Sequence, residues 1–386
     1  MGILIVDDSQ ANLFVIENIL KRAGYDDYLS FTSAQELFTF LLKEQPLEIG
    51  KQIDMILMDI MMPEMDGIEA CKRLQQYPHL KDIPVIFVTA LEDSNKVVEA
   101  LDAGGIDYVT KPINKTELLA RIRVALRLKY EKDWHIEQEE KIRNELELSM
   151  HVQTSLLSEP VYKDNLLLKA SYLPAFKLAG DMYYWHRINE HRYAAIQLDM
   201  MGHGISASLV CMFISSVLRD SISTYADPEY VIKELNRWMN SLNDRNEQIP
   251  YYFTAIYLVL DTKEKTLEYV NAGHPTGFAL VNNTELKELS SNTCAVGFFE
   301  EINIKKSIIT YTDSIQLLLC TDGVEETIDQ HETDGYEYIK NIASSYWHDS
   351  KSKEPIDFIL TKKQQVNADD DICVVLIQAT SKGDLE

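Results

Sequence analysis

The sequence predicts two domains of mixed α and β structure that are joined by a long helix. Over residues 1–127, short apolar runs alternate with helical patterns, which is typical of a doubly wound α/β domain with a five-stranded parallel sheet. Residues 128–158 contain neither proline nor glycine and are predicted to form a helical linker. Residues 159–386 combine many strand-like runs with a pair of helices, which indicates an α+β sandwich flanked by helices. A chain of 386 residues is long enough for two such cores.

The strands of the first domain are predicted from unbroken apolar runs. A parallel sheet carries helices on both faces, so its strands are buried on both sides and show no alternation of polar and apolar residues. Between the runs, residues such as Leu13, Ile16 and Leu20 recur at the spacing of one helix face. The five runs are Ile3–Val6, Tyr28–Phe31, Met55–Met58, Val85–Val88 and Tyr108–Thr110.

The predicted linker extends a longer helical segment, from Thr116 to about Leu157, which is dense in Glu, Lys, Arg and Leu. It is predicted to be one long helix, or two helices end to end, that Pro160 brings to a close. Its heptad pattern is too imperfect to establish a coiled coil. A solvated spacer is one interpretation. The other is a helix that pairs two copies of the chain as a homodimer or that transmits torque between the domains. We favour it because the helix joins two domains that both need partners.

The last domain is predicted from six apolar runs and two helices. The helices, Ile205–Ser223 and Pro228–Leu242, follow one another in the middle of the domain, which is typical of a layered α+β arrangement. The runs are Leu166–Tyr172, Tyr193–Leu198, Phe253–Leu260, Leu267–Val270, Ile315–Leu319 and Ile372–Ile377.

Composition narrows the choice of partners and compartment. The net charge of −24, from 37 basic and 61 acidic residues, disfavours a nucleic-acid partner because phosphates would be repelled. The N-terminus lacks the features of a signal peptide, and no run of about 18 uncharged apolar residues predicts a membrane span. The five cysteines are scattered without a C-x-x-C pair, so we expect reduced core residues and a cytoplasmic protein.

A first group of acidic residues lies at the predicted strand ends of the first domain. Asp7 and Asp8 follow the first strand and Asp59 ends the third, so the three carboxylates meet at the carboxyl edge of the sheet. Such a group needs a cation, and all-oxygen ligands favour Mg²⁺. Thr89 and Lys111 end the fourth and fifth strands and would hold phosphoryl oxygens. Asp59 is the predicted nucleophile toward a phosphoryl group.

These motifs resemble those of two-component response-regulator receiver domains. The resemblance covers residues 2–127 and rests on Ile-Val-Asp-Asp, Met-Asp-Ile-Met-Met-Pro-x-x-Asp-Gly, Val-Thr-Ala and Tyr-Val-Thr-Lys-Pro. It implies that a cognate sensor histidine kinase phosphorylates Asp59. The implied roles of the other residues are Asp8 as a direct Mg²⁺ ligand, Asp7 as a ligand largely through water, the Met61 carbonyl as a further ligand, Thr89 and Tyr108 as switch residues, and Lys111-Pro112 as a cis peptide.

A second group of acidic motifs lies in the last domain. Asp181 follows a glycine, Asp199 is followed by Met-Met-Gly-His-Gly, Asp322 stands in Thr-Asp-Gly, and Asp370 is the middle residue of Asp-Asp-Asp. Three of them, Asp199, Asp322 and Asp370, lie at ends of apolar strands, so they can assemble one site of oxygen ligands for Mg²⁺ or Mn²⁺. There is no cluster of His and Cys ligands in the sequence, which disfavours zinc. Two such cations would hydrolyse a phosphomonoester.

The second group resembles the SpoIIE/RsbU-type PPM (PP2C-like) serine/threonine phosphatases, from about residue 145 to 380. The matching segments begin at Val152, Ala179, Asp199, Asn271, Thr321 and Asp370. The resemblance implies two Mn²⁺ or Mg²⁺ ions, with Asp199 bridging them, the Met200 carbonyl binding one, and Asp181, Asp322 and Asp370 supplying the other carboxylates. It also implies a phosphorylated anti-anti-sigma (STAS) substrate and control of a general stress sigma factor, as in the partner-switching phosphatases.

Two departures qualify this resemblance, and two histidines invite a further role. Tyr184 stands where the family often has a second acidic residue, which affects an accessory metal but not the central pair. Met201 replaces a small residue before Gly-His-Gly. His203 and His274 are candidates for a general acid, but we interpret both as loop histidines because a metal already activates the water.

Two other functions compete with the phosphatase hypothesis. The domain would act as a weakly catalytic adaptor that sequesters a regulator if Tyr184 and Met201 disabled it. A metal phosphodiesterase acting on nucleotides is the other alternative, which the acidic composition disfavours.

Overall fold

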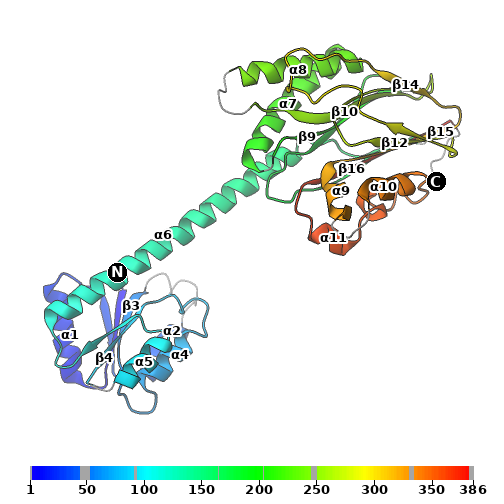
Figure 1. The fold of residues 1–386 in the computed structure, drawn as a ribbon. Helices are drawn as coiled ribbons and strands as arrows, with labels where there is room; N and C mark the ends of the chain where they lie inside the picture. The colour runs from blue at the N-terminus through cyan, green and yellow to red at the C-terminus, as the bar shows by residue number, and fades with distance from the viewer. Residues whose placement is uncertain are drawn as a thin grey trace. The chain divides into compact units, whose positions relative to one another are not determined.

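The computed structural model describes residues 2–43, 53–90, 94–163, 165–202, 204–244, 250–329 and 334–381. It comprises two compact units, Met1–Ile142 and Arg143–Glu386 (Figure 1). The division falls inside the segment predicted as a linker. Each unit has its own hydrophobic core and is described separately.

The N-terminal unit is a five-stranded parallel sheet in the order β2-β1-β3-β4-β5, as the apolar runs predicted. One core packs on each face of the sheet, which explains why the strands are apolar on both sides. The strands are β1 (Gly2–Val6), β2 (Tyr28–Phe31), β3 (Ile53–Asp59), β4 (Val85–Thr89) and β5 (Asp107–Thr110). The helices are α1 (Gln10–Arg22), α2 (Ala34–Lys43), α4 (Gly67–Leu74), α5 (Ser94–Asp102) and the first part of α6 (Lys115–Thr154).

Helix α4 is fixed beside the carboxyl end of β3. The side chain of Asp66 caps it by accepting a hydrogen bond of 2.7 Å from the Glu69 backbone N–H. A Cβ atom on Gly67 would lie 2.1 Å from the Asp59 carbonyl oxygen, so only glycine fits there. This close approach places the start of the helix against the residue predicted to be phosphorylated.

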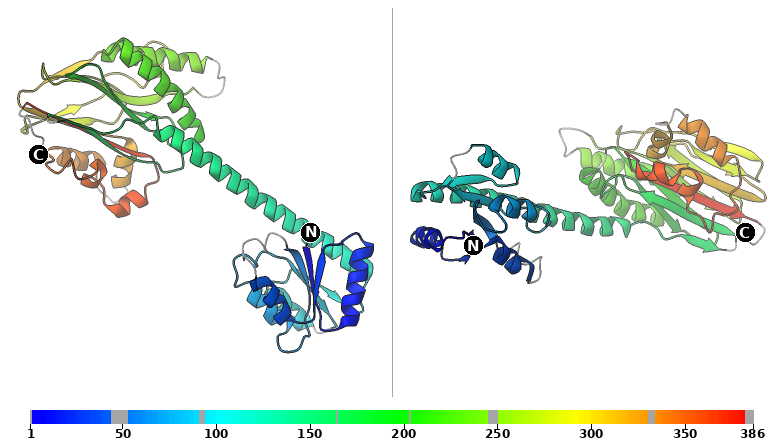
Figure 2. Two further views of the ribbon diagram at one scale, coloured as in Figure 1. Left: turned by 180° about the vertical axis from the view of Figure 1, so that it is seen from behind. Right: turned by 90° about the horizontal axis from the view of Figure 1, so that it is seen from below.

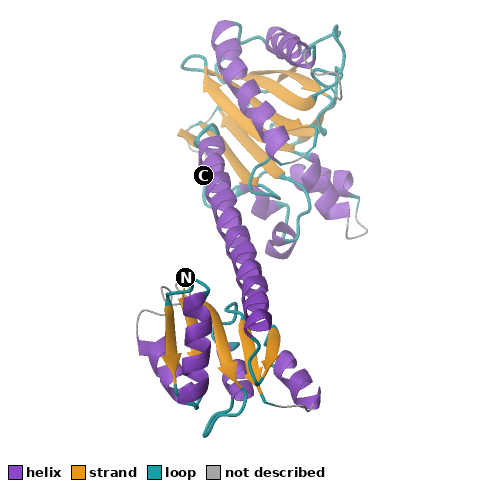
Figure 3. Cartoon of the chain, turned by 90° about the vertical axis from the view of Figure 1, so that its left-hand side faces the viewer, coloured by secondary structure: helices purple, strands orange, loops and turns teal. Residues whose placement is uncertain are grey.

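Helix α6 is one continuous helix of 40 residues, not two (Figure 3). It ends at Thr154, in a turn where the Leu157 N–H bonds the Thr154 carbonyl, so the expectation that Pro160 closes it was wrong. Its middle and last turns carry exposed apolar side chains, which a solvated spacer does not need. These are Val124, Leu128, Tyr130, Trp134, Ile136, Ile142, Leu148 and Val152.

The C-terminal unit is a sandwich of two antiparallel sheets (Figures 1 and 2). Their orders are β14-β11-β10-β9-β8 and β13-β12-β15-β16-β7-β6. The strands are β6 (Val161–Lys163), β7 (Leu166–Leu173), β8 (Met182–Arg187), β9 (Arg192–Met200), β10 (Phe253–Asp261), β11 (Thr266–Ala272), β12 (Gly277–Val281), β13 (Glu285–Leu289), β14 (Ser307–Thr310), β15 (Ser314–Cys320) and β16 (Ile372–Thr380). The six predicted runs all lie in strands, whereas β6, β8 and β12 to β14 were not predicted.

Helices cover the outer face of each sheet (Figure 1). Helices α7 (Ile205–Thr224) and α8 (Pro228–Asn243) share a core with the first sheet. Helices α9 (Asp322–Asp329) and α10 (Gly335–Ala343), the 3-10 helix η1 (Pro355–Phe358) and α11 (Lys362–Val366) cover the second. A third core fills the space between the two sheets.

Helix α7 is long and apolar enough to cross a membrane, by length and composition only. Half of its most apolar window is buried within the unit. Val210, Ile214 and Leu218 of this helix belong to the core that it shares with the first sheet. This is the packing of a core helix.

The core between the sheets should dominate the stability of the C-terminal unit. Leu258 of β10 is fully buried there, so we expect Leu258→Ala to lower the free energy of unfolding by about 2–5 kcal/mol. The buried Trp185 and Trp347 would report the transition in urea. Val366→Ala, at a side chain that is 83% exposed, is the control and should change it by less than about 0.5 kcal/mol. Equal stability of the Leu258 variant and the parent would contradict the packing described.

Candidate metal centres

The N-terminal unit gathers three carboxylates at the carboxyl edge of its sheet. Ligand oxygens of Asp7, Asp8 and Asp59 lie within 4.8 Å of one another. Asp7 and Asp59 are buried, whereas Asp8 is exposed. The Lys111 Nζ atom lies 2.8 Å from an oxygen of Asp7 and 2.8 Å from an oxygen of Asp59. The predicted convergence of strand ends is therefore present.

The electrostatics of this site show competing effects on Asp59. Burial raises the pKa of Asp59 above its ordinary value, although the hydrogen bond and charge of Lys111 lower it. Partial burial disfavours the charged form of Lys111, but its hydrogen bonds to Asp59 and Asp7 leave its pKa raised. Lys111 is thus a positive charge held next to the Asp59 carboxylate. Asp8 is exposed, so a cation can reach the carboxylates from solvent on that side.

The other residues predicted for this site lie on β4 and β5 or just after β3 and β5. Thr89 is buried at the end of β4. Tyr108 on β5 is partly buried, and the guanidinium of Arg121 lies 5.7 Å from the centre of its ring. The Met61 side chain is exposed, and its backbone N–H lies 3.4 Å from an Asp59 oxygen. The Lys111-Pro112 peptide bond is cis, as predicted.

The C-terminal unit gathers carboxylates from four separate elements. Asp181 precedes β8, Asp199 is the penultimate residue of β9, Asp322 begins α9, and Asp370 precedes β16. Oxygens of Asp322, Asp370 and Glu326 lie within 4.8 Å of one another. Glu326 was not among the predicted ligands. Its position one helical turn after Asp322 on α9 was the signal that would have found it.

Burial and repulsion between carboxylates raise the pKa values of the aspartates in this cluster. Burial, and then the charge of Asp199, raises the pKa of Asp181 well above its ordinary value, while a hydrogen bond from Thr321 opposes this. Burial and the charge of Asp322 raise the pKa of Asp199 to about 7. Burial and the charge of Asp370 also raise the pKa of Asp322. The four predicted aspartates therefore interact electrostatically within a single site.

The donor set fits hard divalent cations. The Oδ2 atom of Asp181 is buried and has no hydrogen-bond partner among the described residues, which is costly unless a cation binds it. The Met200 carbonyl oxygen lies beside this segment, because a Cβ atom on Gly180 would be only 3.2 Å from it. Carboxylate and carbonyl oxygens are the ligands that Mg²⁺ and Mn²⁺ take.

Asp371, the neighbour of Asp370, supports the site from the backbone side. Its buried carboxylate accepts hydrogen bonds of 2.9 Å from the Ala175 N–H and 2.8 Å from the Gly180 N–H. The backbone of Gly323 packs against it so closely that a Cβ atom there would lie 2.1 Å from the Asp371 carbonyl oxygen. Asp371 therefore fixes the segment that carries Asp181.

The two histidines differ in what the structure describes. His203 lies outside the described residues. His274 is buried, and its Nδ1 atom is 2.8 Å from the Thr254 hydroxyl. Burial lowers the pKa of His274 to about 3, so its imidazole is uncharged at neutral pH. This supports the interpretation as a loop histidine, since an uncharged imidazole lacks the proton that a cationic general acid would give.

The structure describes both departures that the sequence predicted, Tyr184 and Met201. Tyr184 on β8 is partly buried, and the Arg219 guanidinium lies 5.2 Å from its ring centre, so this position makes an aromatic contact in place of a carboxylate ligand. The N–H of Met201 bonds the Tyr252 carbonyl at 3.0 Å.

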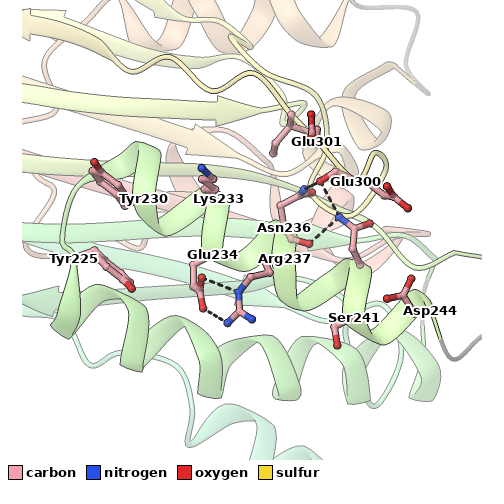
Figure 4. A pocket seen from close by; sticks show the side chains of 12 residues that line it. Tyr225, Tyr230, Lys233, Glu234, Asn236, Arg237, Ser241, Asp244, Glu300 and Glu301 are labelled. Carbon is pink, nitrogen blue, oxygen red and sulfur yellow. Dashed lines mark hydrogen bonds and ion pairs between the residues drawn. The ribbon is translucent and has the colours of Figure 1, made fainter.

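A cavity of about 860 Å³ lies elsewhere, along α8 and the segment 300–302 (Figure 4). Its walls include the paired Glu234 and Arg237, with 3.0 Å between Glu234 Oε2 and Arg237 Nε. None of the four predicted aspartates lines it.

Two family models match the chain. The model described as response regulator receiver domain matches residues 3–123. The model described as stage II sporulation protein E (SpoIIE) matches residues 189–380. The two matches fall in the two units.

Curated relatives agree with this division. The phosphoserine phosphatase RsbP of Bacillus subtilis is 34% identical over 239 residues, which are 61% of this chain and 58% of RsbP. The transcriptional regulatory protein YvrH of Bacillus subtilis is 36% identical over 130 residues, 34% of this chain and 51% of YvrH. The chain thus spans just over half the length of each relative.

A solved structure shares the fold of the larger unit. The SiaA-PP2C domain of Pseudomonas aeruginosa aligns with a TM-score of 0.51 at 17% identity, over 64% of this chain and 99% of that domain. The expected PP2C-like sandwich is confirmed by this likeness.

The raised pKa of Asp199 predicts an unusual pH dependence of metal-free protein. An unfolded aspartate titrates near 3.8 and the folded one near 7, so the folded state holds the extra proton between these values. Stability is then present below pH 3.8 and is lost as the pH rises toward 7.

The measurement is the thermal midpoint of the C-terminal unit in chelator. We expect a lower midpoint at a pH above 7 than at a mildly acidic pH, and recovery when Mn²⁺ is added. Asp199→Asn should remove part of the pH dependence. The same pH dependence in parent and Asp199→Asn would contradict the electrostatic account.

Proposed function

We propose that this chain, which joins a response-regulator receiver domain to a PP2C-like domain of the SpoIIE type, is a metal-dependent protein serine/threonine phosphatase controlled by phosphorylation of Asp59. The observation that carries the proposal is the cluster of Asp181, Asp199, Asp322 and Asp370, which four elements of the sandwich bring to one site. Such a cluster is unstable without cations, and divalent cations at carboxylates suit phosphoester hydrolysis.

In the phosphatase site, Mg²⁺ or Mn²⁺ ions when bound activate water and neutralise phosphoryl charge. Asp199 stands between Asp181 and Asp322 in the chain of mutual interactions, so it is the candidate for a ligand shared by two ions. Asp322, Glu326 and Asp370 hold the more exposed side, and Asp181 holds the buried side. The Met200 carbonyl is the candidate neutral ligand.

In the receiver site, a phosphohistidine of a sensor kinase is the proposed phosphoryl donor. The Asp59 carboxylate attacks phosphorus, an O–P bond forms, and the P–N bond to histidine breaks. Lys111 already contacts Asp59 and can pair with a phosphoryl oxygen. Mg²⁺ bound near Asp8 would neutralise the remaining negative charge of the phosphoryl group. Asp7 and the Met61 carbonyl are its further candidate ligands. Thr89 and Tyr108 would be the switch residues that respond to phosphorylation of Asp59.

The proposed substrate is a phosphoserine on a STAS-type anti-anti-sigma protein in the cytoplasm. Two points support it: the identity to a relative named as a phosphoserine phosphatase, and the family resemblance of the motifs. Dephosphorylation would let the STAS protein bind its anti-sigma factor and free a general stress sigma factor.

Removal of a central ligand tests the catalytic proposal. We expect Asp322→Asn to lower Mn²⁺-dependent release of phosphate from a phosphoserine STAS protein by more than about 100-fold, because loss of even a supporting residue around a metal costs 10–100-fold. Asp349→Asn, at a carboxylate that is 68% exposed, is the control and should retain activity.

The same assay decides between the alternatives. Wild-type protein that binds the STAS protein but releases no phosphate would indicate an adaptor. Hydrolysis of a cyclic dinucleotide in preference to the phosphoprotein would indicate a phosphodiesterase.

The receiver proposal predicts a response that depends on Asp59. An acyl-phosphate mimic such as beryllofluoride should change the phosphatase rate of the wild type by about fivefold or more, the usual size of coupling between two sites. Asp59→Ala should not respond, whereas Asp102→Asn, an exposed carboxylate of the same unit, should respond normally. Equal responses of wild type and Asp59→Ala would remove the switch from the account.

A homodimer through α6 is proposed from its exposed apolar side chains. Ile142 and Leu148 are 58% and 63% exposed, and we expect Ile142→Lys with Leu148→Lys to shift the chain toward monomer in sedimentation equilibrium. Ile308→Lys, at a side chain that is 58% exposed on β14, is the matched control. An unchanged mass of the α6 variant would refute pairing through this helix.

A further inference from the structure

The last turn of α6 holds the backbone that precedes Asp181. The Gln153 side chain is only 4% exposed. Its Nε2 atom donates a hydrogen bond of 2.7 Å to the Ala179 carbonyl, and its Oε1 atom accepts one of 3.2 Å from the Ala179 N–H. Both polar ends of one amide thus bind the backbone of one residue, two positions before a candidate metal ligand.

The strand that follows Asp181 is hydrogen-bonded to the segment directly after α6. The Ser158 hydroxyl accepts a hydrogen bond of 2.9 Å from the Trp185 N–H, and the indole of Trp185 donates one of 2.9 Å to the Glu159 carbonyl. Arg219 of α7 donates to the Leu156 carbonyl at 3.0 Å. Asp181 therefore lies between Ala179, which the last turn of α6 binds, and Trp185, which the segment directly after α6 binds.

A fixed backbone matters at Asp181 because this carboxylate is buried and is repelled by its neighbours. It is 2% exposed, and its Oδ2 atom lacks a hydrogen-bond partner among the described residues. Without fixed backbone on either side, the side chain would relax away from the other carboxylates. A metal site requires that its ligands keep their place, and supporting hydrogen bonds provide this.

A second contact joins α6 to the same segment but differs in burial. Lys177 and Glu147 form an ion pair of 2.9 Å with side chains 44% and 48% exposed. Water and salt screen such a pair, so it constrains the segment weakly. It offers a matched control for Gln153.

We propose that Gln153 is a positioning residue that couples α6 to the metal affinity of the phosphatase site. Helix α6 begins in the receiver unit and ends at this clamp, so a rotation or shift of its last turn moves Ala179 and with it Asp181. This rests on the proposed function and deepens it by assigning the contact through which the receiver regulates the site.

Metal binding tests the positioning role without relying on turnover. In the full chain with Asp8→Asn, which removes a receiver ligand, calorimetric titration with Mn²⁺ should show a dissociation constant about tenfold higher for Gln153→Met. Lys177→Ala should match the parent. A merely structural role would lower the thermal midpoint and leave the Mn²⁺ affinity unchanged.

A second variant keeps the test decisive if Gln153→Met does not fold. Gln153→Glu retains an acceptor for the Ala179 N–H but sets an oxygen against the Ala179 carbonyl, so it should also weaken Mn²⁺ binding. Parental Mn²⁺ affinity in either folded variant would overturn the positioning role.

Regulation is tested with Asp8 intact. The ratio of phosphatase rates with and without beryllofluoride should fall toward one in Gln153→Met and stay at the wild-type value in Lys177→Ala. A full response in Gln153→Met would overturn the coupling. A wild type without phosphatase activity would refute the proposed function instead, while the Mn²⁺ titration would still decide the positioning role.

Discussion

Repulsion between carboxylates that are held close together, several of them out of water, is the constraint on which both sites depend. In the C-terminal unit, burial and the charge of neighbouring carboxylates raise the pKa values of Asp181, Asp199 and Asp322, so the cluster favours protons or cations. The fold opposes their separation with backbone contacts, among them the Asp371 carboxylate that binds the Gly180 N–H. The receiver unit meets the same constraint with an ammonium, because Lys111 contacts both Asp7 and Asp59.

The two solutions suit two kinds of chemistry. In the N-terminal site Lys111 partly neutralises the carboxylates, and under the proposed function Asp59 would form a bond with phosphorus. In the C-terminal site no lysine or arginine is bound to the four aspartates in any contact described, and under the proposed function divalent ions would meet this charge and activate water. Between them runs α6, whose last turn holds Ala179 through the buried Gln153. A coupling free energy of about 1–3 kcal/mol is enough for regulation, and a few such hydrogen bonds are of that size.

Much of this was predictable from the sequence, for physical reasons. Runs such as Val85–Val88 and Ile372–Ile377 are apolar without interruption because both faces of each strand are buried, and acidic residues after such runs mark ligand sites. Strands such as β13 (Glu285–Leu289), at a sheet edge and rich in charge, carry no such signal. Nor does sequence separate Asp370, which faces the other carboxylates, from Asp371, which binds backbone amides. Gln153 follows Val152 in one of the segments that resemble the phosphatases, but its role requires Ala179, 26 residues away, to lie beside it.

The central claim is that carboxylates from distant parts of the chain are assembled around divalent cations. Anomalous diffraction from crystals soaked in Mn²⁺ tests it most directly. The account predicts two manganese peaks within coordination distance of Asp181, Asp199, Asp322 and Asp370, with Asp199 common to both. Crystals in which these side chains point to separate surfaces, with no manganese between them, would contradict it.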